Sequence, residues 1–447
     1  MGGWRWYRTR RRLRTHRVWK LPVVLLLVGL FLSWLLPAAD REFTHLQRDL
    51  GEQFFPHLDS GSMSTLLGAV AGGMITLTGL VFTALTLAMQ FGAAQLSVRV
   101  VPILQQEPVM RWAMGTFMAT FVYTLMVSVR LAVREEDYRP VLSMLFAIGL
   151  SVVCAVLFFA LVARVSSVLN SGALLRTLAT EGRRAVFRTH PSGPPAHVGA
   201  PPEGGAHEEG GAHEEGAPEV LRLGAPPRGG QVLLAFDARR LERLARRRGV
   251  RLELVPVVGD FVALEAPLFV VHGPGGRIRR RALLRCLLFG ETQSVSGDPA
   301  GALRALVDIA LKALSPAVND PGRAVQVLDH IEDLLVLLAP RTAPTPAARP
   351  AAFTHRTRSW ADYVCLGTDE IRHFGAASVQ VQRRLRALYA TVAPVCGPER
   401  AGPVDARLAT MDAETLRQWP QELDRRLAGR PDPQGLGTEG GSGAPAS

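Results

Sequence analysis

Lysine is almost missing from this sequence: Lys20 and Lys312 are the only two, while lysine and arginine together number 51. Arginine therefore supplies nearly all the positive charge, and the 447 residues carry a formal net charge of +12. Nucleic-acid-binding proteins share such an excess, but they interleave aromatic residues for stacking on bases. Here the excess lies beside apolar runs and in short helical clusters without that pattern, so we expect no nucleic-acid partner.

Paired cysteines are also absent. Cys154, Cys286, Cys365 and Cys396 are widely separated and contain neither a CxxC pair nor zinc-site spacing. This favours free, reduced thiols.

Motifs with a known chemistry are missing as well. The sequence has no HExxH, P-loop or GxSxG motif, and no paired-carboxylate or Ser/His/Asp arrangement in a supporting context. A tandem GAHEEG repeat at 205–216 brings His207 and His213 next to glutamates. These residues could bind a metal weakly, but a tandem duplication in a linker that tolerates insertions is the simpler explanation of the repeat. We therefore predict no enzyme, no cofactor and no metal site.

Charged residues are absent from the 39 positions of 60–98. About 20 apolar helical residues cross the roughly 30 Å hydrocarbon core of a bilayer, so this run is long enough to span one. The same criterion applies to three other runs. The predicted transmembrane helices are 21–39, 62–90, 112–129 and 141–163.

The charges around these spans predict their orientation. Residues 1–20 are rich in arginine and tryptophan, whereas the loop at 40–59 is poor in positive charge. By the positive-inside rule both termini are cytoplasmic and the protein is a multi-pass protein of the cell (inner) membrane. The first span resembles a signal peptide cleaved after 37–39, but its apolar run is long, which favours an uncleaved anchor.

The second span carries its polar and small residues on one face. At about 100° per residue they fall within an arc of roughly 80°. We name this face the seam, and it consists of Thr65, Gly68, Gly72, Thr76, Gly79, Thr83, Thr86 and Gln90.

Two interpretations of the seam remain open. Small residues let helices approach closely, and Gly68-x-x-x-Gly72 is a packing motif of that kind. Alternatively, several subunits bring their seams together, and the hydroxyl and amide groups line a polar path. The spans contain no carboxylate, lysine or histidine, which disfavours proton-coupled transport.

The second half of the chain reads as a soluble, cytoplasmic α/β domain at 231–395, after a Pro- and Gly-rich linker at 189–230. Strand patterns at 231–237, 251–257 and 261–271 surround an arginine-rich helix, and together they predict a small β-sandwich-like hairpin unit. We also expect a helix at 279–289. We predict that a transmembrane domain at 1–188 precedes this soluble domain and that a mostly disordered tail at 396–447 follows it.

A helical bundle is predicted after the hairpin unit. A helix at 302–314 has one apolar face and an Asp308–Lys312 pair opposite. The next helix begins with Asp320 as its cap and is followed by helices at 360–374 and 377–391. Its expected buried residues are Val325, Leu328, Ile331, Leu335 and Leu338.

Between the first two of these helices lies the best polar constellation of the soluble half. Ser315, Asn319 and Asp320 form a candidate ligand loop, although capping and turn chemistry explains the same residues. On the following helix, periodicity places four polar residues on the solvent side, where a solvated face is favoured over a metal site. These are Asp329, His330, Glu332 and Asp333.

Three stretches together resemble a bacterial family of predicted integral membrane proteins of unknown function (domain of unknown function 2254). They are ITLTGLVFTALTLAMQFGAAQLSVRV at 75–100, GDFVALEAPL at 259–268 and LVDIALKALSPAVNDP at 306–321, with IRHFG at 371–375 in the expected place. The resemblance implies four spans followed by a soluble domain, and no established activity. This chain departs from it at Ala317-Val318 and at Gly297-Asp298-Pro299, where relatives have other residues.

GDFVALEAPL also resembles the hairpin of biotinyl and lipoyl carriers, but no lysine lies near it, which excludes a covalent cofactor.

These observations lead to a functional expectation and an alternative. The first is a homo-oligomeric, channel-like or permeation protein with a cytoplasmic regulatory domain, surrounded by membrane lipids. The alternative is a non-conducting membrane scaffold or sensor that relays a cytoplasmic ligand or partner.

Overall fold

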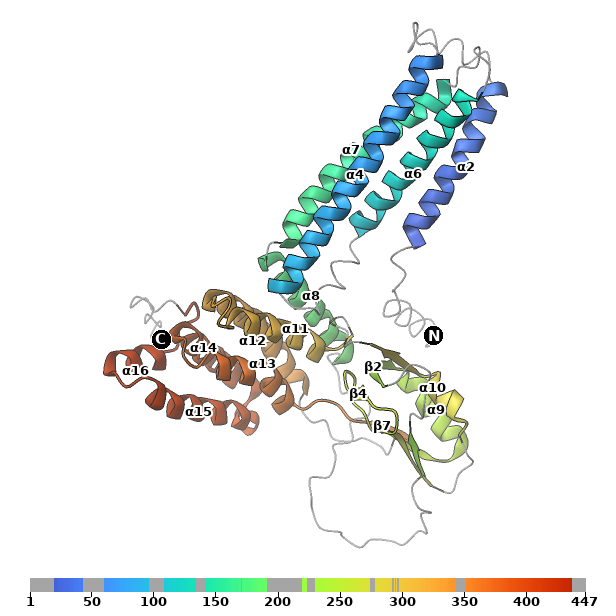
Figure 1. Ribbon diagram of the computed structural model, residues 1–447. Helices are drawn as coiled ribbons and strands as arrows, with labels where there is room; N and C mark the ends of the chain where they lie inside the picture. The colour runs from blue at the N-terminus through green and yellow to red at the C-terminus, as the bar shows by residue number, and fades with distance from the viewer. Residues whose placement is uncertain are drawn as a thin grey trace, which may run out of the picture. The chain divides into compact units, whose positions relative to one another are not determined.

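The computed structural model describes residues 20–42, 60–95, 108–133, 141–169, 171–190, 219–222, 230–273, 278–291, 293, 295, 297–342 and 351–435. The chain forms two compact units (Figure 1). The membrane unit comprises residues 15–94 and 98–173, and the mixed unit consists mainly of residues 174–447.

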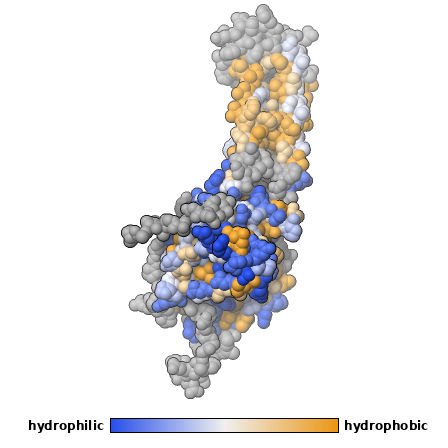
Figure 2. Space-filling view, turned by 90° about the vertical axis from the view of Figure 1, so that its left-hand side faces the viewer, coloured by the Kyte–Doolittle hydropathy of each residue, from blue (hydrophilic) through white to orange (hydrophobic). Residues whose placement is uncertain are grey.

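Four long helices run side by side in the membrane unit (Figure 1). They are α2 (Lys20–Glu42), α4 (Ser60–Gln95), α6 (Pro108–Ala132) and α7 (Val141–Leu169). All four are long and apolar enough to cross a membrane, as predicted. The 36 residues of α4 extend for about 54 Å at 1.5 Å per residue, well beyond a hydrocarbon core of about 30 Å. Figure 2 shows apolar side chains covering much of the surface of this unit.

Glycines bring α2 and α6 into close contact. A Cβ atom added at Gly29 would lie 2.7 Å from the carbonyl oxygen of Ala119. A Cβ atom added at Gly115 would lie 2.6 Å from the side chain of Leu25 and 3.0 Å from Cα of Pro22. Such a backbone approach is the usual basis of helix association in lipid. The first apolar helix is therefore an integral part of the bundle.

A buried carboxylate joins the end of α2 to the start of α7. Asp40 is fully buried, and its two oxygens accept hydrogen bonds from the backbone N–H groups of Leu142 (3.0 Å) and Ser143 (3.2 Å). Ser143 Oγ donates a further bond of 2.5 Å. The first N–H groups of a helix lack partners within it, and a carboxylate here satisfies them. Asp40 thus acts as a cap supplied by another helix.

Seven short strands of the mixed unit form two sheets. They are β1 (Glu219–Arg222), β2 (Gln231–Phe236), β3 (Arg251–Leu254), β4 (Phe261–Val262), β5 (Pro267–His272), β6 (Leu287–Gly290) and β7 (Phe353–His355). The strand orders are β1-β5-β3-β7 and β4-β2-β6, and only the β3–β7 pair is parallel among the described strands.

The predicted helix α9 (Ala238–Arg248) is confirmed. It ends at Gly249, whose φ of 65° suits a residue without a side chain.

Two sequence predictions for this region were wrong. The segment 279–289 contains a short helix, α10 (Arg280–Leu284), and then strand β6. Cys286, Leu287 and Leu288 are all buried, and a continuous apolar run cannot be assigned by periodicity. Strand β1 lies inside the predicted linker and pairs with β5. The GAHEEG repeat lies outside the described residues.

The rest of the mixed unit is helical. It contains α8 (Ser171–Thr189), α11 (Pro299–Ala313), α12 (Pro321–Leu338), α13 (Trp360–Phe374), α14 (Val379–Cys396), α15 (Gly402–Gln418) and α16 (Glu422–Gly429). All five residues predicted to be buried on α12 are buried. Helix α8 crosses α11 and α12 at Gly182, where an added Cβ would lie 2.9 Å from Cβ of Ala302 and 3.0 Å from the side chain of Leu334.

The prediction of a disordered tail after residue 396 was wrong for its described part, which contains α15 and α16. Helix α15 buries few apolar residues, and its composition therefore gave little helical signal. Arginine–carboxylate pairs attach it instead to α13 and α14. The pairs are Arg372–Glu414 (2.5 Å), Arg407–Asp369 (2.5 Å) and Arg386–Asp412 (2.5 Å).

Ion pairs add contacts to two predicted polar features. Asp329 and Asp333 are exposed, as predicted, and Glu332 is half-buried. Asp329 and Glu332 both bind Arg384 of α14, at 2.8 and 2.6 Å. Asp308 pairs with Arg304 at 3.5 Å. The chain therefore uses arginine across helix contacts, where its planar fork of donors holds carboxylates better than lysine does.

Candidate functional site

The seam lies on the outward side of α4. All of its members are exposed except Thr86, which is half-buried. The buried residues of α4 include Met63 and Val81, which lie about 180° around the helix from the centre of the seam, and Leu67 and Ala71, which lie about 140° and 100° from it. Helix α4 therefore packs on the bundle through the opposite face, and the seam is left open within one subunit.

The glycines and threonines of the seam have simple local geometry. A Cβ atom added at Gly68, Gly72 or Gly79 would have no atom within 4 Å. Threonine hydroxyls donate to carbonyl oxygens one turn back, as in Thr76 to Gly72 (2.9 Å) and Thr83 to Gly79 (3.0 Å). These hydroxyl protons are satisfied within the helix, and the hydroxyl oxygens keep lone pairs that can accept hydrogen bonds.

The candidate ligand loop is organised by turn and cap chemistry. Ser315 Oγ donates to the carbonyl of Lys312 at 2.7 Å. Asp320 accepts from the backbone N–H of Arg323 at 3.0 Å and caps α12. Asn319 has a φ of 46°, a conformation that asparagine tolerates better than most residues. The structure brings these residues together, and its bonds within the loop account for Ser315 and Asp320.

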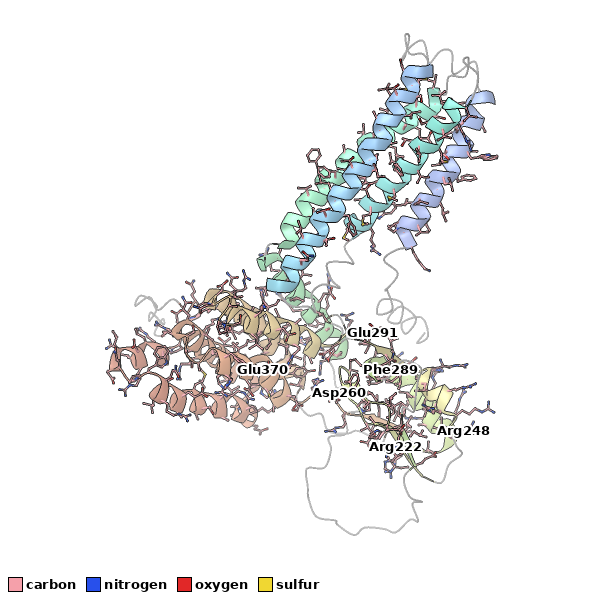
Figure 3. The ribbon with its side chains drawn as sticks, in the orientation of Figure 1. Arg222, Arg248, Asp260, Phe289, Glu291 and Glu370 are labelled. Atoms are coloured by element: carbon pink, nitrogen blue, oxygen red, sulfur yellow. The ribbon has the colours of Figure 1, made fainter. Side chains whose placement is uncertain are left out.

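A second polar cluster joins three segments that are far apart in the sequence. We name it the acid cluster: Asp260 in the turn before β4, Gln293, Asp298 at the start of α11, and Arg358 just before α13. Asp260 Oδ1 lies 3.2 Å from Nη2 of Arg358 and its Oδ2 accepts from the N–H of Val257 at 3.0 Å. Figure 3 labels Asp260 between the strands and helices of this unit.

Asp298 is the buried member of this cluster, with 7% of its surface exposed. Its Oδ1 accepts from the N–H of Ala300 at 3.2 Å, while Oδ2 is buried without a hydrogen bond of ordinary geometry in the described structure. Gly259, with a φ of 96°, lies directly beside it: an added Cβ would be 2.6 Å from Nε2 of Gln293 and 3.3 Å from Oδ2 of Asp298. The turn therefore needs glycine both for its backbone angle and for space.

The surroundings of Asp298 shift its proton affinity. Burial raises the pKa of this carboxyl to about 6, and nearby Asp260 adds to the rise. The Ala300 N–H, Arg358 and Gln293 act in the opposite direction. Burial also raises the pKa of Tyr363, whose phenol lies within electrostatic reach of Asp298. A buried carboxyl that titrates near neutral pH is a recognised sign of a functional site.

Sequence reasoning missed the acid cluster. Gly259-Asp260 was interpreted only as a turn between strands, and Gly297-Asp298 was noted only within the family resemblance. Their contact depends on how β2, β4 and α11 pack, which no local pattern reveals. Among the described residues no group of three or more His, Cys, Asp or Glu side chains is arranged to hold a metal ion, and all four cysteines are free.

Four helices that are long and apolar enough to cross a membrane, followed by a mixed unit of two small sheets and a helical bundle, indicate a membrane protein. The chain belongs to the family described as predicted membrane protein (DUF2254), whose model matches residues 15–391. Among curated relatives are uncharacterized proteins of Mycobacterium tuberculosis and Mycobacterium bovis. Each is 26% identical over 393 residues, covering 82% of this chain and 71% of the relative. No solved structure matches the chain.

Proposed function

We propose that this chain is one subunit of a homo-oligomeric, channel-like protein of the cell (inner) membrane, in which the seams of several copies of α4 face a shared axis. The observation that supports this proposal is the open seam. A Cβ added at any of its three glycines would have no atom within 4 Å, and its threonines are exposed except for the half-buried Thr86, although α4 is packed on its other side. In the proposed assembly both termini are cytoplasmic and the mixed unit regulates permeation. The proposal includes no catalytic activity.

The polar groups of the seam suit this role. Threonine oxygens and the Gln90 amide supply acceptors along a helix that otherwise presents apolar side chains to lipid. The seam contains no charged residue, so the proposed path selects by size and hydrogen bonding rather than by a ring of charge. Helix α8 follows α7 after a single residue and packs in the mixed unit, which provides a covalent route for regulation.

A second candidate is a non-conducting scaffold or sensor. Two observations favour it. The threonine protons of the seam are already bonded within α4, so the seam is suited to dry packing between subunits as well. In addition, the acid cluster offers a place where a proton or a small ligand acts on the mixed unit. The two candidates share the oligomer and differ in whether a path passes through it.

Conduction is tested by narrowing the proposed path at Thr83. We expect Thr83→Trp to abolish the single-channel current that the wild-type protein carries in planar bilayers in potassium chloride, while the mass of the assembly is unchanged. The matched control is Phe82→Trp, because Phe82 is exposed at the same depth but points about 100° away around the helix. Currents that are equal in wild type and Thr83→Trp, or absent from both, would rule out the channel and leave the scaffold.

A further inference from the structure

Two short helices that lie near each other in Figure 1, α9 and α10, carry a dense group of exposed arginines. Helix α9 turns Leu241 and Ala245 into the core of the unit and its arginines outward. At about 100° per residue, five of these arginines fall within an arc of roughly 120°. The exposed arginines of α9 are Arg239, Arg240, Arg243, Arg246, Arg247 and Arg248.

Helix α10 extends this surface with four more exposed arginines, Arg279, Arg280, Arg281 and Arg285. The segments next to the two helices are bonded to each other: the N–H of Asp237, the cap of α9, donates to the carbonyl of Cys286, two residues after α10, at 2.9 Å. Cys286 is buried, and its pKa is raised to about 11 by that burial, while Arg240 and Arg243 act to lower it. Both guanidinium groups therefore lie within electrostatic reach of the end of α10. We name these ten arginines the basic face.

Little negative charge balances the basic face. Asp237 caps α9 by accepting from the N–H of Arg240 at 3.1 Å. Glu242 pairs with Arg246 at 2.6 Å and also accepts from the N–H of Phe353 at 2.8 Å. Within the described part of the chain, Arg246 is the one member of the face that makes an ion pair with a carboxylate. Elsewhere in this unit arginines are matched by carboxylates, as in Arg407–Asp369 and Arg372–Glu414.

We propose that the basic face is a docking surface for anionic phospholipid headgroups. Arginine forks bind phosphate through two parallel hydrogen bonds, and the face presents many of them on rigid, packed helices. Neither α9 nor α10 contains an aromatic residue, so the face has no platform on which nucleic-acid bases stack. The chain is itself a membrane protein, which keeps this unit at high effective concentration near a bilayer.

The test uses the full chain in nanodiscs of neutral phosphatidylcholine. These are mixed with separate vesicles that contain either phosphatidylcholine alone or about 30% of the anionic lipid phosphatidylglycerol. We expect co-flotation with the anionic vesicles only, weakening steeply with added salt. Each basic residue near an anionic surface contributes roughly a fivefold gain in binding. Arg239→Glu/Arg243→Glu/Arg247→Glu should therefore weaken binding about 100-fold or more.

The matched control is Arg417→Glu/Arg426→Glu/Arg430→Glu. These three arginines are also exposed in the mixed unit, and the triple variant makes the same change in net charge on α15 and α16 and just beyond. It should retain binding within about threefold. Equal losses in the two variants would show that net charge alone is responsible and would overturn the proposal. No binding by the wild type, or stronger binding to single-stranded RNA than to anionic vesicles, would overturn it as well.

Discussion

Replacing Gly29 by leucine should separate α2 from α6 and destabilise the membrane unit by about 3 kcal/mol or more. The added side chain meets the backbone of Ala119, which cannot move without displacing α6. Overpacking against flexible side chains costs roughly 1–3 kcal/mol, and a backbone contact leaves less room for relief. The measurement is the thermal midpoint of the detergent-solubilised protein, followed by size-exclusion chromatography after heating.

Gly72→Leu is the matched control, because it makes the same substitution in another long apolar helix. No atom lies within 4 Å of a Cβ added at Gly72, so the isolated subunit should keep its thermal midpoint. In the proposed assembly the same change lies on the seam and should reduce the mass of the oligomer. A large fall in midpoint with Gly72→Leu, or none with Gly29→Leu, would contradict the described packing.

The second large effect is expected at the acid cluster. Asp298→Asn should stabilise α11 and its neighbours at pH 7.5 by on the order of 2 to 3 kcal/mol, because a shift of about two pKa units corresponds to that free energy. Burial raises the pKa of Asp298 from 3.8 to about 6. The amide keeps an oxygen that accepts from the Ala300 N–H, and it carries no charge to be buried.

The sign of the pH dependence follows from the same shift. Between pH 3.8 and about 6 the folded state holds the Asp298 proton more tightly than the unfolded state, so this carboxyl's contribution to stability falls as the pH rises. Above pH 6 the loss is complete. The advantage of Asp298→Asn should therefore be absent near pH 4, grow through pH 6 and then stay constant.

Hydrogen exchange of the α11 amides, measured across this pH range, gives the local free energy of unfolding. Asp320→Asn is the control, since it also replaces a helix-capping carboxylate with an amide, but at a partly exposed position. An equal advantage of Asp298→Asn at pH 4 and pH 7.5 would contradict the assignment of a buried, titrating carboxyl. A carboxylate that lowers stability at neutral pH is expected at a position kept for function.

Features specified by neighbouring residues could be predicted from the sequence. The four spans follow from apolar length, and the boundaries of α9 and α13 follow from their amphipathic patterns and end signals. Asp320 was correctly placed as the cap of α12, because an Asp-Pro pair suits the cap and the first turn. These are interactions within about four residues, which local patterns record.

Features that depend on distant contacts could not be predicted. Helix α15 is attached by arginines from α13 and α14, and such pairs leave no periodic apolar signal in the segment itself. The acid cluster requires Asp260, Asp298 and Arg358 to meet across the fold. The open side of the seam, likewise, could be assigned only once the packed side of α4 was known.

The most direct test of the proposed function is the subunit arrangement of the full chain in nanodiscs, determined by native mass and by imaging along the membrane normal. We predict a ring of identical subunits in which Thr76, Thr83 and Gln90 of each α4 face the central axis. A monomer, or an oligomer in which other helices face the axis and the seams contact lipid, would contradict the proposal.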